Sequence, residues 1–569
     1  MLSRLLVSLL AVVAGVFSHP ASSATVAGRT YSPDRVPIKG ALVTLSSADG
    51  MVSETVYTDG TGAFQLETKL YGRLMLRARA PADADAVQAV DVPAGAGRIE
   101  QSFTLRRLTT AQELSDSLPA SAHFARIKFP TPAARQQFQT DCLSCHEIGN
   151  PFTRNAARTP EQWAAFVQLM LTYAGYTDKN HLQEYAGALH HAFDGTPTNA
   201  HERVTPDDGA VNARITEWKL SGAVIAHDTE FNAADGKFYT VDQGVDSVYV
   251  TDPVANVTVR VALADNNVPV GGSFTEHGYP VPFGLTVRHG LHSIQLGPDG
   301  RLYTTGAIGG ELGIFDPKTL KYESHRIGGN SLYPHTLRFD KTGIAWFSIA
   351  QSNQIGRYDP SNAAIKVIDL PRGVTRSNTR EPLPYGIDIN PIDGSVWYSK
   401  LWANKIGRLD AKTLEVREFD PPVFGPRRLR FDSSGALWIP GFGDGKLAWL
   451  DPRTMKYEIY RIPTLASDEV EAPYAVAVDP RTQDVWVTAN MSDRAFRFIQ
   501  KTRRFRVYPL PTRGTYFRDF IFTPDGRVCA SSSPMPPRSE VVEGGTDTLV
   551  CIETNDPSVT HSDDSARAR

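Results

Sequence analysis

A pattern that recurs between about residues 215 and 552 limits the possible folds of this chain more than any other feature. Residues 334–359 and 384–410 are two clear copies: each begins with Pro, has a turn Gly three residues before a Trp, and ends in Ile-Gly-Arg-x-Asp. Aligning the turn Gly and the following aromatic residue gives seven units, whose first residues are 42 to 65 residues apart. Each unit predicts four short strands, and closing such sheets into a ring protects their edges. The sequence therefore predicts a mainly β protein in which residues 210–555 form a seven-bladed β-propeller.

The first residue of each unit stands where the innermost strand is expected to enter the central channel. These seven side chains should converge there, joined by Asp242 and Lys400 from the far ends of their strands. Neutral imidazoles on consecutive units could bind a divalent metal, or one could act as a general base. The alternative is an ordinary polar, water-filled channel. The seven leading residues are His227, His292, His335, Tyr385, Arg427, Tyr474 and Arg518.

The second informative feature is Cys142-Leu143-Ser144-Cys145-His146, which has the C-x-x-C-H pattern of covalent c-type haem attachment. In that chemistry Cys142 and Cys145 form thioethers and His146 is an axial ligand of the iron. A redox dithiol followed by an unrelated His, or half of a zinc site, are the alternatives. The chain has four Cys and no second C-x-x-C pair to complete a zinc site. We therefore predict one haem c.

Helix signals concentrate around this motif, in residues 108–206. Thr131-Pro132 and Thr159-Pro160-Glu161-Gln162 each place a cap before a first-turn Pro. Five apolar residues share one face of the second helix, which predicts a buried stripe. They are Trp163, Phe166, Val167, Met170 and Leu171.

The segment 108–206 resembles a small all-α, mono-haem cytochrome c domain. The resemblance implies Met170 as the second axial ligand, because it is the only Met of the segment and lies where such domains carry their distal Met. His181, His190 and His191 are rival ligands, and a core Met is the other alternative. Methionine ligation raises the reduction potential relative to two histidines, which favours an electron-accepting role.

The N-terminal part of the chain predicts export and a small β domain. Residues 1–24 have one early Arg, a short apolar run and small residues near the end, typical of a signal peptide. Residues 25–107 alternate as short strands with turns and predict an Ig-like β-sandwich. The stretches 36–41, 58–60 and 62–64 resemble the carboxypeptidase regulatory-like domain, which implies packing or docking and no catalysis. Residues 556–569 are expected to be a disordered tail.

Composition and cysteine usage narrow the compartment and the partners. The formal net charge of −3 gives no argument for nucleic acid, and no segment after the signal peptide predicts a membrane span. A periplasmic or secreted location follows from the export signal together with the haem motif. In such an oxidising compartment Cys529 and Cys551 could form a disulfide, the alternative being two separate buried thiols.

The repeats themselves resemble the streptogramin (virginiamycin B) lyase family, whose units carry similar Pro-His and Ile-Gly-Arg patterns. The resemblance implies a propeller, and for the lyase reaction two leading histidines, a Glu fourteen positions after the second and a divalent cation. His292 and His335 match the histidines, but Ile349 stands at the position of the Glu. Without that carboxylate, a C–O lyase reaction lacks a catalytic group.

The sequence thus leads to one main functional hypothesis and two others. The main hypothesis is an exported c-type cytochrome for electron transfer or oxidoreductase activity, in which the propeller binds an unknown small-molecule substrate or redox partner and the haem accepts an electron. The alternative is a haem-containing binding or sensing module without turnover. A streptogramin-type lyase is the least favoured.

Overall fold

The computed structural model describes residues 23–154, 157–173, 181–199, 204–373, 382–534 and 545–555. Residues 1–22 of the expected signal peptide and the whole of the expected tail, 556–569, lie outside the described residues. None of the described helices is long and apolar enough to cross a membrane.

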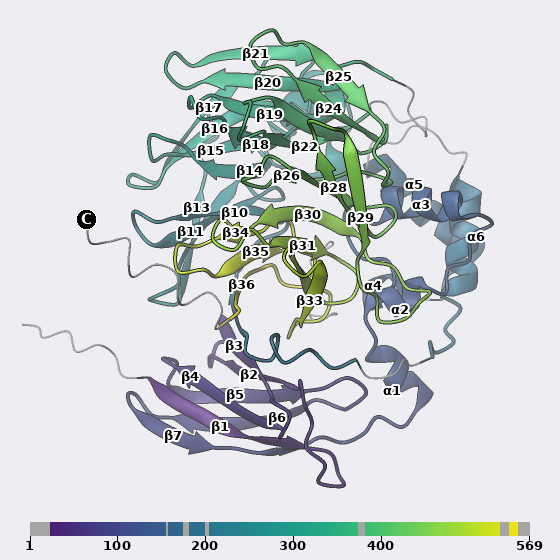
Figure 1. Cartoon of the computed structure of the whole chain (residues 1–569), viewed down its shortest axis with the longest axis vertical. Coiled ribbons are helices and arrows are strands. Elements are labelled where there is room, and N and C mark those ends of the chain that lie inside the picture. Colours follow the sequence, from purple (N-terminus) through teal and green to yellow (C-terminus); the bar gives the residue numbers. More distant parts are fainter. Residues whose placement is uncertain are drawn as a thin grey trace, which may run out of the picture.

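The N-terminal segment folds into two sheets that face each other around one apolar core (Figure 1, purple). Its strands alternate buried and exposed residues, as expected where one face of a sheet is covered. One sheet has the order β4-β1-β7 with β8 beside β1, and the other contains β3-β2-β5-β6. The strands are β1 (Ala24–Tyr31), β2 (Leu42–Ser46), β3 (Val52–Tyr57), β4 (Ala63–Thr68), β5 (Gly72–Arg79), β6 (Ala86–Val92), β7 (Gly97–Glu100) and β8 (Phe103–Thr104).

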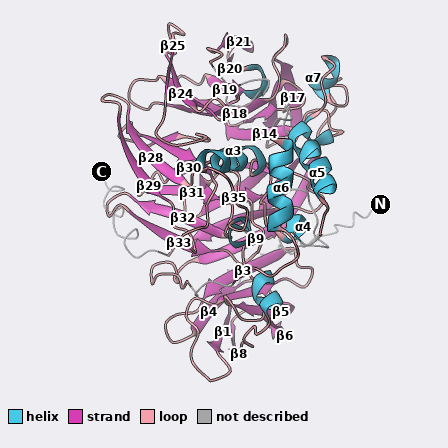
Figure 2. Cartoon of the chain, turned by 90° about the vertical axis from the view of Figure 1, so that its right-hand side faces the viewer, coloured by secondary structure: helices cyan, strands magenta, loops and turns pink. Residues whose placement is uncertain are grey.

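Six helices follow within the described residues; α1 lies beside the N-terminal domain, and the others lie over one side of the large β region (Figures 1 and 2). Thr131 caps α3 by accepting a hydrogen bond from the Ala134 amide, and Thr159 and Gln162 form the predicted capping box of α5. The helices are α1 (Ala111–Asp116), α2 (Ala120–Phe124), α3 (Pro132–Cys142), α4 (Pro151–Arg154), α5 (Pro160–Tyr173) and α6 (Leu182–Ala192).

The large β region contains six successive four-stranded antiparallel sheets, arranged as in a propeller. In each sheet, the strands pair in chain order, so each sheet is one meander. The first three sheets are β10 (Ala226–Asn232), β11 (Lys237–Asp242), β12 (Ser247–Asp252) and β13 (Val257–Ala262); β14 (Leu291–Leu296), β15 (Leu302–Gly306), β16 (Glu311–Asp316) and β17 (Lys321–Arg326); and β18 (Pro334–Phe339), β19 (Ala345–Ile349), β20 (Gln354–Asp359) and β21 (Ala364–Asp369).

The next three sheets have the same order and lead to the C-terminal part of the chain. They are β22 (Pro384–Ile389), β23 (Val396–Lys400), β24 (Lys405–Leu409) and β25 (Val416–Phe419); β26 (Arg430–Phe431), β27 (Leu437–Gly441), β28 (Lys446–Asp451) and β29 (Lys456–Arg461); and β30 (Pro473–Val478), β31 (Val485–Ala489), β32 (Arg494–Ile499) and β33 (Arg504–Pro509).

The last sheet joins strands from three parts of the chain, which the sequence did not predict. The strands β34 (Ile521–Phe522), β35 (Val528–Ser532) and β36 (Thr548–Glu553) pair in order, and β36 then pairs with β9 (Arg214–Lys219) from before the first sheet. Strand β9 also pairs with β3, so the sheet continues without a break into β3-β2-β5-β6 of the N-terminal segment. The N-terminal domain is therefore fixed to the β region by backbone hydrogen bonds.

The long connection between the first two sheets reaches the helices. It carries α7 (Gly272–Glu276) and the short 3-10 helix η1 (Pro282–Gly284). A Cβ added at Gly284, where φ is +64°, would lie 3.5 Å from the Tyr173 ring of α5. This connection thus packs against the helical segment. A second 3-10 turn, η2 (Ala350–Ser352), follows β19 on this side.

Two features of the innermost strands determine where the leading residues point. In five of the sheets, the pairing of the first two strands shifts register near the leading residue, a bulge that redirects side chains. In five of the sheets, a Ser or Thr on the second strand donates a hydrogen bond to the carbonyl of a leading residue in the next sheet. The donor and acceptor residues are Thr305 and His335, Ser348 and Tyr385, Ser399 and Arg427, Thr488 and Arg518, and Ser531 and His227. The last pair joins the final sheet to the first.

Candidate haem cavity and the cluster beneath it

The C-x-x-C-H segment and helix α5 line one apolar cavity of about 460 Å³. This volume lies in the range of about 300–1,000 Å³ typical of ligand and cofactor sites. Cys142, Cys145, His146 and Met170 are all on its wall. Aromatic and aliphatic side chains make up most of the rest, among them Phe138, Phe152, Trp163, Phe166, Leu189, Phe283 and Leu285.

The residues of this cavity fit a c-type haem. His146 is buried, and its Nδ1 lies 2.9 Å from the Glu147 carbonyl oxygen. A ring nitrogen that donates to a backbone carbonyl leaves Nε2 to ligate a metal, as metal-binding histidines commonly do. Burial raises the pKa of the Cys142 and Cys145 thiols, whereas a reactive redox dithiol has a lowered pKa. Among the described residues, no group of three His, Cys, Asp or Glu side chains has the arrangement of a metal site, here or at the three leading histidines.

Helix α5 contributes six apolar side chains to the cavity wall, and two of them, Phe166 and Met170, are far less buried than the sequence predicted. Trp163, Val167 and Leu171 are buried in the core. Phe166, Leu169 and Met170 line the cavity and stay 41%, 42% and 39% exposed, a large exposure for apolar side chains. A flat apolar group bound in the cavity would cover them.

Met170 lies on the cavity wall, and the three rival histidines do not line it. His181 lies beside Glu184, with 3.4 Å between its Nδ1 and the carboxylate. His190 Nδ1 is 2.9 Å from the Arg158 carbonyl oxygen, and His191 is next to it on α6. Met170 therefore remains the described residue best placed as second axial ligand.

The same C-x-x-C-H segment covers the centre of the β region. The Tyr516 hydroxyl donates a 2.6 Å hydrogen bond to the Leu143 carbonyl, and Arg427 Nη2 donates a 3.2 Å bond to the Ser144 carbonyl. Two backbone carbonyls between the cysteines are thus held by side chains of the propeller-like part. The expected open channel is closed at this end by the segment that carries the cysteines.

Beneath this segment the three leading histidines lie in a row of closely spaced rings, here called the histidine stack, whose successive planes are tilted by 35° and 44°. The ring centroids of His227 and His292 are 3.6 Å apart, those of His292 and His335 are 3.8 Å apart, and Tyr385 lies 3.8 Å beyond His335. All three imidazoles are buried. Burial, and then the charges of nearby arginines and protonation of neighbouring imidazoles, keep their pKa values well below the usual range, so they are neutral at pH 7.

Beside the stack, two tyrosines and an arginine form a second group. The hydroxyls of Tyr385 and Tyr474 are 2.8 Å apart, and Arg427 Nη2 donates a 2.5 Å hydrogen bond to Tyr385. The Arg427 guanidinium carbon is 3.7 Å from the centroid of the Tyr474 ring. Burial opposes ionisation of Tyr474, but Arg427, Arg428 and Arg518 outweigh it and lower the pKa of its hydroxyl.

The expected members Lys400 and Asp242 have other partners. The Lys400 ammonium at the end of β23 lies 2.6 Å from the Glu418 carboxylate on β25, two strands away in the same sheet. Asp242 accepts hydrogen bonds from the amides of residues 224, 225, 244 and 245, and so holds two loops together. Lys400 thus pairs within its own sheet, and Asp242 bonds to the loops at the end of its strand.

The lyase carboxylate has no substitute at its position in the sequence. Ile349 ends β19 and is fully buried in an apolar cluster between two sheets. The divalent metal expected in the channel stays a prediction.

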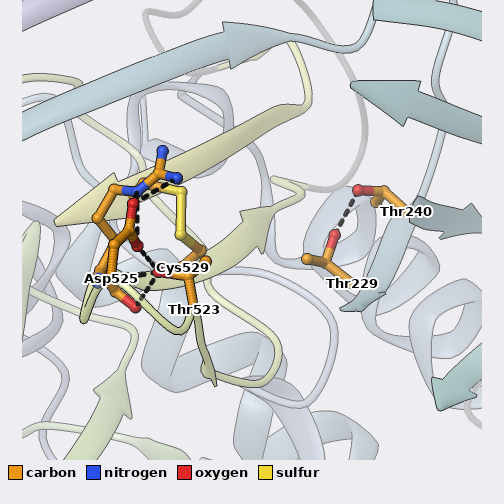
Figure 3. Close-up of a disulfide and its surroundings, with 7 residues drawn as sticks. Thr229, Thr240, Thr523, Asp525 and Cys529 are labelled. Atoms are coloured by element: carbon orange, nitrogen blue, oxygen red, sulfur yellow. Dashed lines mark hydrogen bonds and ion pairs between the residues drawn. A yellow bond between two sulfur atoms is a disulfide. The ribbon is translucent and has the colours of Figure 1, made fainter. Parts of the chain in front are cut away.

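The structure joins Cys529 on β35 to Cys551 on β36 by a disulfide (Figure 3). The two residues are direct partners in the strand pairing, and their Cα atoms are 4.1 Å apart. Thr523 and Asp525, also shown in Figure 3, lie on the turn before β35, where Asp525 pairs with Arg527 at 3.0 Å. The disulfide thus ties together two strands of the sheet that also holds β9.

Sequence reasoning missed Tyr333 and Tyr516, which stand two residues before His335 and Arg518. The Tyr333 hydroxyl accepts a 2.6 Å hydrogen bond from Gln243, and Tyr516 holds the C-x-x-C-H segment. It also missed the Ser and Thr residues thirteen or fourteen positions after a leading residue. The Ser and Thr residues recur at a fixed place in the repeat, which could have revealed them, whereas Tyr occurs two residues before the leading residue in only two of the seven units.

Comparison with known proteins confirms one resemblance directly. Residues 25–106 match the family model of the carboxypeptidase regulatory-like domain. No curated protein matches the chain.

Among solved structures, the propeller-like part is similar in fold to streptogramin lyases. Virginiamycin B lyase from Staphylococcus aureus aligns with 16% identity and a TM-score of 0.46, over 60% of this chain and 99% of that one. A streptogramin B lyase aligns with 17% identity and a TM-score of 0.47, over 61% and 100%. The extracellular domain of a putative hybrid two-component system from B. thetaiotaomicron aligns with 13% identity and a TM-score of 0.42, over 59% and 42%. Similarity at this level concerns the fold and says nothing of activity.

Proposed function

We propose that the protein is an exported c-type cytochrome with electron-transfer or oxidoreductase activity. The observation that carries the proposal is that Cys142, Cys145, His146 and Met170 lie on the wall of a single apolar cavity. Cys142 and Cys145 would tether the haem, and His146 Nε2 and the Met170 thioether would ligate its iron. When bound, the haem accepts and returns one electron.

The residues around the motif suit a redox site that changes little between states. The hydrogen bond from His146 to the Glu147 carbonyl fixes the orientation of the imidazole. Tyr516 and Arg427 hold the backbone between the two cysteines. The apolar wall excludes water, which keeps the local dielectric constant low.

We further propose that the β region closes into a seven-bladed propeller, with β9 completing the last blade. The hydrogen bond from Ser531 to the His227 carbonyl supports this closure. A disulfide between Cys529 and Cys551 supports export to an oxidising compartment. A lyase reaction finds no support in a buried histidine stack with Ile349 at the position of the Glu.

A potentiometric titration followed by visible absorption tests the redox role. The wild-type protein should show a single one-electron wave, and Met170→His should lower the midpoint potential, because replacing the thioether with a second imidazole stabilises ferric iron. Ala165→His, which changes an exposed residue of α5 that does not line the cavity, is the control and should leave the midpoint unchanged. A haem that cannot be reduced within the range of biological donors would favour the binding or sensing alternative.

A further inference from the structure

A second cavity, of about 70 Å³, lies between the C-x-x-C-H segment and the centre of the propeller-like part. One water molecule needs about 10–15 Å³ on this measure, so the cavity has room for several water-sized groups, while drug-sized ligands need about 300 Å³ or more. Its size therefore restricts an occupant to a few heavy atoms. Cys145 lines both this cavity and the larger apolar one.

Two buried side chains on its wall have nitrogens without a hydrogen-bond partner among the described residues. Arg427 is 1% exposed and has Nε and Nη1 unpartnered, and His335 is 1% exposed and has Nε2 unpartnered. The Thr336 hydroxyl lies 2.9 Å from His335 Nδ1. If this hydroxyl donates, the proton of the neutral imidazole is on Nε2, so both side chains present donors.

One carboxylate, that of Asp141, also lies on the cavity wall, where it accepts hydrogen bonds from Gln137 and from the Tyr185 hydroxyl. Arg428 pairs with Asp228 at 2.7 Å, whereas Arg427 forms no ion pair within 4 Å among the described residues. Arg427 contacts Tyr385, Tyr474, Phe442 and the Ser144 carbonyl. A buried cation without an opposite charge is strongly destabilising, so such sites usually contain an anion.

We propose that this cavity binds a small anion, of the size of formate or nitrite, through Arg427 and His335. Arginine and a neutral imidazole donor are typical ligands of carboxylates and oxyanions. Tyr474 could replace the bound anion, because its hydroxyl, if ionised to tyrosinate, would balance the positive charge of Arg427. It does not line the cavity, however, and its hydroxyl is already paired with Tyr385. Binding does not depend on the haem; a role of the anion as electron donor would rest on the proposed function.

Isothermal titration calorimetry of the purified full-length protein with sodium formate tests this site. We expect one formate per chain with a dissociation constant of about 1 mM or less. Gln351→Glu places a carboxylate on the wall of the cavity at a half-buried position and should weaken binding at least tenfold. Gln65→Glu adds the same charge on the exposed face of β4 and should not change it.

Arg427→Gln should also weaken formate binding at least tenfold. If Arg427→Gln does not fold because the residue is buried, Gln351→Glu still tests the site. Equal affinity in wild type and Gln351→Glu would overturn the proposal. So would a Soret shift on binding, since it would place the anion on iron. No binding at millimolar formate, together with tyrosinate absorption that Tyr474→Phe removes, would assign the counter-charge to Tyr474. If protein made in a host with working haem attachment carries no haem but still binds formate, the proposed function is rejected and this site is kept.

Discussion

At the scale of single residues, the two iron-ligand candidates differ in how they are held. His146 is buried and oriented by the Glu147 carbonyl, whereas Met170 lies on the cavity wall beside the more deeply buried Trp163, Val167 and Leu171 of the same helix. The side chain of Met170 is 39% exposed, so it contributes little to the core. Its role is then best explained by a group bound in the cavity.

Replacing this residue gives a prediction at the same scale. Met170→Ala should abolish the iron–thioether charge-transfer band of the ferric protein, while the fold persists because little buried surface is lost. The visible spectrum measures the first effect and a thermal melt the second. Leu169→Ala removes a neighbouring side chain that is 42% exposed and should keep the band. A band that survives Met170→Ala, or a spectrum that changes in His190→Ala, would assign the second ligand elsewhere.

At the scale of elements, Ser and Thr hydroxyls on the second strands link neighbouring sheets. Ser348 accepts a 3.2 Å hydrogen bond from the Thr336 amide of its own sheet and donates a 2.7 Å bond to the Tyr385 carbonyl of the next. Ser399 is arranged in the same way: it accepts a hydrogen bond from the Gly386 amide and donates one to the Arg427 carbonyl. These bonds hold the leading residues at a common depth, which explains why side chains from different sheets stack.

Ser348→Ala should therefore lower the free energy of unfolding by about 1–3 kcal/mol, because it leaves a buried amide and a buried carbonyl without a partner. Urea denaturation measures the change. Ser361→Ala is the control: that hydroxyl also forms a hydrogen bond, 2.6 Å to Asp359, but on an exposed turn. We expect a change of less than about 0.5 kcal/mol there. Equal losses in both variants would contradict a special role of the hydroxyls between sheets.

Much of the fold and part of the candidate site could be predicted from the sequence, because the repeat and the C-x-x-C-H pattern each lie within short stretches of the chain. The repeat gave the four-stranded units and the convergence of His227, His292 and His335. Lys400 could not be placed, since its partner Glu418 lies on another strand and no periodicity encodes that contact. The pairing of β9 with β3 was equally hidden, because a strand edge shared by two domains depends on how they dock.

At the scale of the whole molecule, the three parts form one connected structure. A continuous sheet joins the N-terminal domain to the last sheet of the propeller-like part, and the C-x-x-C-H segment closes the centre of that part. Cys145 lines both the apolar cavity and the small cavity over His335 and Arg427. A molecule bound at the second site would therefore lie next to the attachment point of the proposed haem.

The central claim is that haem is attached covalently at Cys142 and Cys145. The most direct measurement is haem staining after denaturing electrophoresis of the protein made in a host with working haem attachment. The wild type should give a stained band at the mass of the full chain, and the Cys142→Ser, Cys145→Ser double variant should give an unstained band of equal protein content. An unstained wild-type band under the same conditions would contradict the account.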